Sequence, residues 1–120
     1  MSQHDDSLYL THMLESAIKA RQFVENKSRS DYDSDEILSL ALQHLIQIIG
    51  EAAGSVSPAA RALIPSLPWT AITGMRHRIV HGYAIVDHDL VWNTIAQDLE
   101  PLIVAVKAAL DRKQEIRCVR

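Results

Sequence analysis

The segment between Leu38 and Ala52 constrains the fold of this chain more than any other feature of its sequence. Apolar residues recur in it every three or four positions, at Leu38, Ala41, Leu42, Leu45, Ile48, Ile49 and Ala52. This spacing predicts an α-helix. Leu40 and Ile46 widen the apolar surface beyond one stripe. We therefore expect this helix to be buried on more than one side, at the centre of a bundle or at a dimer contact.

Capping residues and breakers predict the limits of this helix and of its neighbours. The stretch 26–35 is polar and turn-rich, which is typical of a loop, and Asp33 or Ser34 can cap the helix that follows and runs to about residue 55. Ser57 and Pro58 then form a good start for a short helix.

Apolar residues at helical spacing predict three further helices, over about 6–26, 68–82 and 87–110. Pro68 and Gly82 mark the start and the end of the second of these. Asp87 can cap the third, and Pro101 inside it predicts a kink or break.

These segments predict an all-α fold, a bundle of four main helices plus a short helix, and no segment clearly predicts a strand. With only 4 Gly and 4 Pro, the chain has few helix breakers. Its 120 residues have the length of a single domain, which we expect to span 1–120. The charged tail 112–120 is expected to fray.

The charge balance and the single cysteine narrow the function classes. A formal net charge of −3 argues against a broad electrostatic grip on nucleic acid, but leaves room for a small basic pocket formed by Arg76 and Arg78. Cys118 has no partner for an intramolecular disulfide, and the N-terminal residues do not resemble a signal peptide. We expect a cytoplasmic chain that does not enter a membrane.

The chemistry-bearing residues gather between 74 and 89, where Arg76, His77, Arg78, His81, Tyr83 and His88 follow one another closely. Arg76 and Tyr83 are seven positions apart, so they share a face if the helix persists. His81 lies about 140° from Arg76 around the same axis, within reach of a phosphate that the long arginine holds.

Metal-free cleavage of RNA suits these residue types. The ribose 2′-OH attacks the adjacent phosphorus, so a base must take its proton and an acid must protonate the leaving oxygen. His81 can do either at cellular pH, and Arg76 can stabilise the charge that builds on the phosphate. A dimer with its axis beside this helix would supply two copies of each residue to one cleft.

Several ordered landmarks resemble one family. The pattern Arg76-x4-His81-x-Tyr83 resembles the signature of the HEPN ribonucleases, and its tyrosine resembles that of the HepT toxins in particular. The run IIGEAA (48–53), the pair Pro68-Trp69, the segment 72–76 and Asp87-x4-Trp92 look like HepT landmarks in the same order. The resemblance covers about residues 9–110.

This resemblance implies an all-helical HEPN-type homodimer in which the two motifs face each other. It implies a metal-independent endoribonuclease toxin without a cofactor, from a type VII-like toxin–antitoxin pair that pairs a HEPN toxin with a minimal nucleotidyltransferase (MNT) antitoxin. In that family the antitoxin transfers AMP to the motif tyrosine, which corresponds to Tyr83 here. AMP would place negative charge beside Arg76 and His81, where the RNA phosphate must bind.

Two supporting positions, His77 and Glu51, stay open. The residue after the motif arginine is commonly Asn in the family and is His77 here, which either replaces the amide, adds an acid or base, or weakens activity. Glu51 either orients Arg76 or His81 or is a surface glutamate. Trp69 and Trp92 fall on apolar stripes, which favours core positions over base stacking.

Three other functions compete with the ribonuclease. His77 and His81 have a two-ligand metal spacing, with His88 or His44 as a third ligand, but no glutamate follows His77 and we expect no metal. A non-catalytic HEPN partner of a nucleotidyltransferase suits the acidic charge. A DNA-binding repressor would need a basic recognition helix, and this sequence does not show one. The sequence does not identify the RNA target, whether messenger or transfer RNA.

Overall fold

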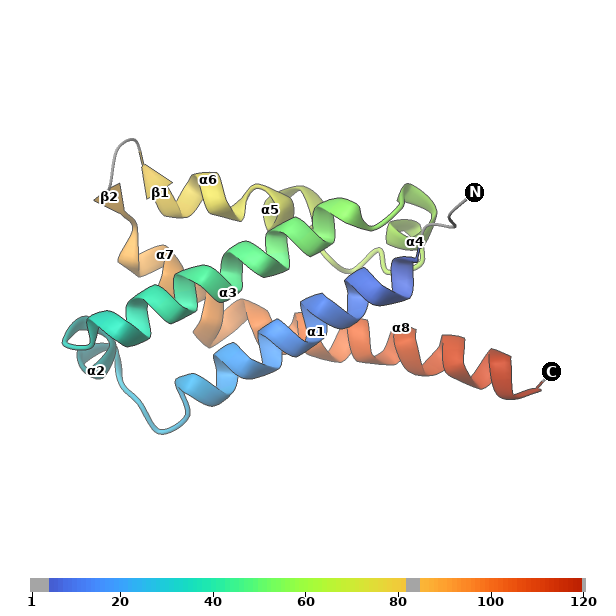
Figure 1. The fold of residues 1–120 in the computed structure, drawn as a ribbon, viewed down its shortest axis with the longest axis horizontal. Coiled ribbons are helices and arrows are strands. Elements are labelled where there is room, and N and C mark those ends of the chain that lie inside the picture. Colours follow the sequence, from blue (N-terminus) through green and yellow to red (C-terminus); the bar gives the residue numbers. More distant parts are fainter. Residues whose placement is uncertain (1–4, 82–84, 120) are drawn as a thin grey trace.

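Two long antiparallel helices, α1 (Asp6–Phe23) and α3 (Glu36–Ser55), lie at the centre of the fold in the computed structural model (Figure 1). The structure describes residues 5–81 and 85–119, with side chains described as far as residue 112 except that of His81. Helix α8 (Leu99–Val119) packs along α1, while α5 (Trp69–Thr73) and α6 (Met75–Ile79) pack on α3. The prediction of an all-α bundle is confirmed.

Helix α3 is buried on several sides, as its apolar pattern predicts. It contacts α1, α2, α5 and α6, and its buried side chains include Leu38, Leu42, Leu45, Ile46 and Ile49. By length and composition it could cross a membrane, but 50% of its most apolar window is buried inside the fold. Its apolar character is therefore explained by its position in the core.

The segment before α3 is not the plain loop that its polarity predicts. Asp35 caps α3, directly after the predicted caps Asp33 and Ser34. Ahead of it, the one-turn helix α2 (Arg29–Asp33) is held by a capping box between Ser28 and Asp31. The burial of Tyr32 gives this short helix its anchor in the core.

The predicted helix over 68–82 is wrong in its second half. Helix α5 gives way at Gly74 to the separate short helix α6, which ends at Ile79 rather than at Gly82. Two short antiparallel strands follow, β1 (Val80–His81) and β2 (Ile85–Val86), which pair Val80 with Val86 and His81 with Ile85. β-branched residues on both strands favour this extended pairing over helix.

The last helical segment begins at the predicted cap and changes type before its proline. Asp87 caps α7 (His88–Asn93), which continues as a π-helical turn, η1 (Thr94–Asp98), before α8. Pro101 has no N–H for the carbonyl four residues earlier, and the wider π turn ends just ahead of it, so the irregularity lies where a kink was expected. Helix α8 continues to Val119, where a frayed tail was predicted.

A glycine sets how closely α3 approaches α5. A Cβ built at Gly50 would lie 3.2 Å from the carbonyl oxygen of Ile72, which is tighter than most real Cβ contacts. At Gly54, one turn further along the same helix, a Cβ would meet nothing within 4 Å. The glycine of the IIGEAA run therefore lets the backbone of α5 approach α3, and this approach positions α6 beside it.

We expect Gly50→Val to lower the free energy of unfolding by more than about 1 kcal/mol, because the branched side chain forces α3 and α5 apart. Gly54→Ala, the matched control, should raise it by up to about 1 kcal/mol, because alanine is the better helix former in open space. Urea unfolding at neutral pH measures both. Equal stability of Gly50→Val and the wild type would contradict the close approach.

Candidate functional site

Helix α6 presents three basic residues to solvent because two apolar side chains anchor its other face. Met75 and Ile79, four positions apart, are both buried, and the hydroxyl of Thr94 in η1 lies 3.7 Å from the sulfur of Met75. Arg76, His77 and Arg78 lie between these anchors and are exposed. The anchoring fixes the direction of this short helix, so its basic residues have defined positions relative to α3.

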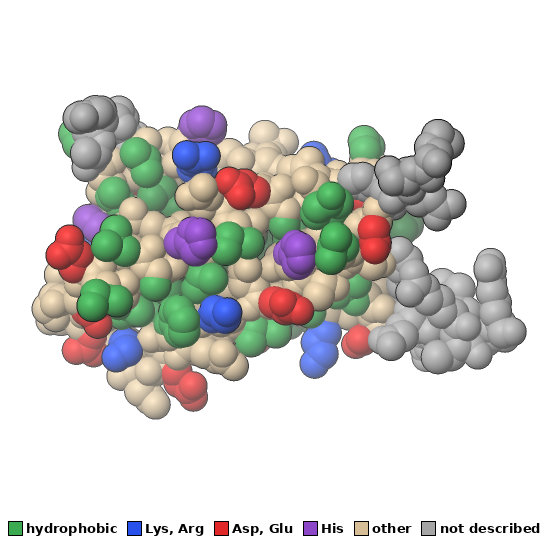
Figure 2. Space-filling model, viewed as in Figure 1, with side chains coloured by type: hydrophobic (Ala, Val, Ile, Leu, Met, Phe, Trp, Pro, Cys, Tyr) green, Lys and Arg blue, Asp and Glu red, His purple; other side chains and the backbone are tan. Residues whose placement is uncertain are grey.

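Arg76 lines a groove between α3 and the end of α6. This groove, of about 290 Å³, is lined by Leu40, Gln43, His44, Ile46, Gln47, Arg76, Ile79 and Val80, and we call it the Arg76 groove. Figure 2, in the same view as Figure 1, shows hydrophobic, His, Lys/Arg and Asp/Glu side chains interspersed over the face that α3 and α6 share. The groove therefore combines an arginine and a histidine with neutral amides.

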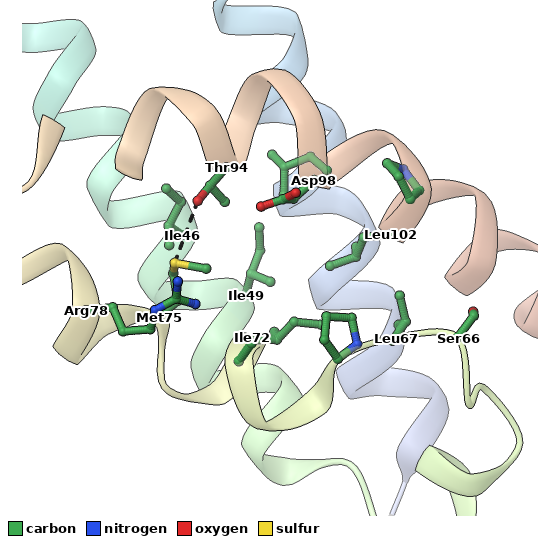
Figure 3. Close-up of a pocket in the computed structure, with 14 residues that line it drawn as sticks. Ile46, Ile49, Ser66, Leu67, Ile72, Met75, Arg78, Thr94, Asp98 and Leu102 are labelled. Carbon is green, nitrogen blue, oxygen red and sulfur yellow. Dashed lines mark hydrogen bonds between the residues drawn. The ribbon is translucent and has the colours of Figure 1, made fainter. Parts of the chain in front are cut away.

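Arg78 points to a different cavity, so the expected single pocket formed by Arg76 and Arg78 is wrong. A mainly apolar cavity of about 220 Å³ lies between α3, α5, η1 and α8, with Arg78 and Asp98 among its lining residues (Figure 3). Residues that are two positions apart on a helix point about 200° apart around its axis, so Arg76 and Arg78 leave α6 on different sides. His77 lines neither cavity.

The arginines of the chain fall into two groups by their contacts. Arg61 donates to the carbonyls of Val56 and Ala53, and Arg21 donates to the carbonyl of Ile95. Within the described residues, Arg76 and Arg78 form no hydrogen bond or ion pair of this kind. A permanently charged guanidinium without such a structural partner is free to bind an anionic ligand.

The strand pair β1–β2 contains the backbone of the motif residue His81. His81 belongs to β1 and pairs with Ile85, while its side chain and the whole of Tyr83 lie outside the described residues. The backbone N–H of Asp87 donates to the carbonyl of Ile79 at 2.6 Å, which closes the base of the pair. The helix ends at Ile79, so the condition under which Arg76 and Tyr83 were expected to share a helix face is not met.

A family model matches this chain over most of its length. The model described as "Ribonuclease HepT-like" covers residues 13–109 and so includes α3, the Arg76 groove and the strand pair. The chain belongs to the HepT-like ribonuclease family.

Similar proteins of archaea and bacteria carry ribonuclease names. A protein of Caldanaerobacter subterraneus named "Putative RNase TTE0752" is 30% identical over 88% of this chain and 95% of its own length. A Thermococcus cleftensis protein named "Probable ribonuclease HepT" is 28% identical over 78% of this chain and 86% of its own. No solved structure gives a significant match.

A buried hydrogen-bond network fixes the element that follows the strand pair. The Tyr32 hydroxyl lies 2.7 Å from Nδ1 of His88, the first residue of α7, and accepts a hydrogen bond from Ser39 of α3 at 3.1 Å. Gln43, which lines the Arg76 groove, donates to the same serine at 3.1 Å. The network therefore links one wall of the groove to the start of α7.

Ionic contacts surround this network at the surface. Arg29 donates to Asp33 and, across to α7, to Asp89, at 2.8 and 2.7 Å. These two hydrogen bonds raise the pKa of the Arg29 guanidinium above its ordinary value. Burial raises the pKa of the Tyr32 phenol, although its hydrogen bond from Ser39 acts in the opposite direction.

The supporting positions have different surroundings in this HepT-like fold. Glu51 is exposed on α3 and accepts a hydrogen bond from Gln47, one turn before it, and within the described residues no ion pair joins it to Arg76. Trp69 packs against the core and donates to the carbonyl of Ile64, and Trp92 packs beside the Tyr32 ring, as the apolar stripes predicted. Neither indole is a free stacking platform.

The histidines proposed as metal ligands are not brought together among the described side chains, where no group of three His, Cys, Asp or Glu residues forms. His88 contacts Tyr32, whereas His44 lines the Arg76 groove. Sequence reasoning considered His44 only as a ligand and missed its position opposite Arg76. It also missed the strand pair, although two β-branched pairs around a glycine-containing stretch are a hairpin signal.

We expect Tyr32→Phe to lower the free energy of unfolding by about 1 kcal/mol at pH 7.5, because it removes the hydroxyl shared by Ser39 and His88. The raised pKa of Tyr32 means that the folded state favours the neutral phenol. The stability that the buried neutral phenol contributes is complete below the unfolded-state pKa near 10 and is lost as the pH rises above it. Urea unfolding at pH 7.5 and 10.5 should therefore show a smaller difference in the free energy of unfolding between the wild type and Tyr32→Phe at the higher pH. A constant gap would contradict the role of burial.

Proposed function

We propose that this HepT-like chain is a metal-independent endoribonuclease that acts on RNA at the Arg76 groove. The observation that supports it most is the state of Arg76, which is exposed in a groove without a structural partner among the described residues. An arginine in this state can hold a phosphodiester through two parallel hydrogen bonds. The ribonuclease names of similar proteins support the same substrate class.

In the proposed reaction, Arg76 binds the non-bridging oxygens of the scissile phosphate. The 2′-OH of the preceding ribose loses its proton to a base and attacks phosphorus, and the bond to the 5′-oxygen of the next nucleotide breaks. His81 accepts or donates one of these protons, since an imidazole can do both near neutral pH. The products are a 2′,3′-cyclic phosphate and a 5′-hydroxyl. In the transition state that leads to them, Arg76 stabilises the negative charge on the phosphate.

A homodimer is proposed because the reaction needs both an acid and a base. Exposed apolar side chains lie beside the groove: Ile37 is 82% exposed, Leu40 58% and Ile85 66%. Apolar side chains this exposed on neighbouring elements are typical of an interaction surface. A second copy that covered them would bring its own Arg76 and His81 toward the same cleft.

The proposed biological role is that of a cytoplasmic toxin controlled by a nucleotidyltransferase antitoxin of the MNT type. The antitoxin would transfer AMP to the hydroxyl of Tyr83, three positions after Val80 of the groove. A nucleotide attached there adds bulk and negative charge that compete with RNA for Arg76. His77, exposed between the two arginines, and Arg78 at the neighbouring cavity are proposed to support the RNA rather than to react.

We expect the purified protein to cleave RNA in excess EDTA and to leave 2′,3′-cyclic phosphate ends. Arg76→Ala should lower the cleavage rate by about 10²–10³-fold, because it removes the charge that stabilises the transition state. His81→Ala should lower it by about 10²–10⁴-fold. Arg112→Ala, which removes an exposed arginine from α8, is the matched control and should cleave at the wild-type rate.

Intact mass must first show that the sample carries no AMP, since a modified sample is expected to be silent. Unmodified protein that leaves RNA intact would contradict the proposal and favour a non-catalytic HEPN partner, for which the exposed apolar side chains beside the groove would be the contact surface.

A further inference from the structure

We propose that His44 is a second phosphate-binding residue, which holds the RNA from α3 while Arg76 holds it from α6. The inference rests on the proposed function, because it assigns a role at the same groove. His44 is exposed, lines the Arg76 groove and lies on the opposite wall from Arg76. The site would therefore bind one phosphodiester between two elements that are far apart in the sequence.

The spacing on α3 places His44 in the middle of the groove wall. Leu40, Gln43, His44 and Gln47 have the spacing i, i+3, i+4 and i+7, so they occupy one face of the helix. The close approach of α3 and α5 at Gly50 holds this face at a fixed separation from α6. His44 is thus positioned by rigid helices on both sides of the groove.

The charges of the groove favour an anionic ligand. Among its lining residues, which belong to the part of the chain that the structure describes, Arg76 is charged and none is a carboxylate, although the Glu51 carboxylate, outside the lining, accepts a hydrogen bond from Gln47. The two glutamines donate through their amide nitrogens to Ser39 and Glu51 within α3. Each amide nitrogen keeps a second N–H, whereas His44 and Arg76 are the lining donors that have no intramolecular partner among the described residues.

Two other histidines with described side chains have structural neighbours that His44 and His77 lack, and His77 lines neither cavity. His88 contacts the Tyr32 hydroxyl, and the ring of His12 packs edge-on against Tyr9. Within the described residues His44 has no hydrogen bond, ion pair or ring contact. An imidazole that is fixed in place by its helix but not by a partner is suited to bind a ligand.

The groove also has the size for one nucleotide unit. Its volume of about 290 Å³ lies just below the range of about 300–1,000 Å³ that is typical of pockets for small molecules. Such a groove takes a single phosphodiester with its sugar rather than a folded RNA. This small area of contact is consistent with the net charge of −3, which argues against a broad electrostatic grip on RNA.

Binding of an uncleavable RNA tests the inference without relying on cleavage. The probe is a short fluorescent oligonucleotide with 2′-fluoro riboses, which lack the attacking hydroxyl, and anisotropy measures its affinity for unmodified protein at pH 6.5. His44→Ala should weaken binding about ten- to a hundredfold, the effect expected for loss of a hydrogen bond to a charged group. His44→Arg should restore at least part of the affinity, because it returns a cationic donor to the same wall.

Two controls show whether a loss of affinity comes from the imidazole at the groove. His12→Ala removes an exposed histidine of α1 outside the groove and should bind as the wild type does. Urea unfolding should show equal stability of His44→Ala and the wild type, because the side chain is exposed. A structural role would not be rescued by arginine.

The outcomes distinguish this inference from the function on which it rests. If Arg76→Ala loses affinity while His44→Ala keeps it, the groove binds RNA but His44 does not, and the inference is overturned. If neither variant differs from the wild type, or if the wild type does not bind, both the inference and the proposed function fail.

Discussion

The burial of α3 on several sides is the constraint on which the rest of the structure depends. Because α1 covers one side of this helix, its other side is available to α5 and α6, and Gly50 allows the closest approach to α5. That contact places α6 at a fixed distance from the polar residues of α3. The Arg76 groove is therefore a consequence of core packing, since both of its walls are surfaces of helices whose opposite sides are buried.

The same packing leaves basic side chains available for chemistry. Met75 and Ile79 anchor α6, so the residues between them must face outward, and the chain then turns into a strand pair that carries His81. Beyond the strand pair, the Tyr32 network fixes the start of α7. The strand pair is thus held at both ends, by α6 and by α7, beside the groove. The basic residues of α6 and the strand pair that follows therefore have fixed positions, which suits the binding of a single phosphate.

Much of the fold could be predicted from the sequence because it depends on local signals. The spacing in α3 and the caps of Ser57 and Asp87 are of this kind, and the structure confirms them. The strand pair was missed because its β-branched residues also continue the helical apolar pattern, and the pairing of Val80 with Val86 decides between the two. Helix α2 was missed because the buried Tyr32 lies in an otherwise polar stretch.

The site was predictable only in part. Arg76 was identified from its motif and does line a groove, but the contribution of α3 is a contact across about thirty residues of sequence that no local spacing contains. The separation of Arg76 from Arg78, by contrast, follows from helix geometry alone, since positions two apart diverge by about 200°.

The central claim is that RNA binds where α3, α6 and the strand pair meet. Backbone amide chemical shifts measured by NMR, with and without the 2′-fluoro oligonucleotide, test it most directly, because they report every contacted element at once. The account predicts the largest changes over residues 40–47, in α6 and in β1, with α8 beyond residue 103 unaffected. Changes centred on α1 and α8, with α6 unperturbed, would contradict it.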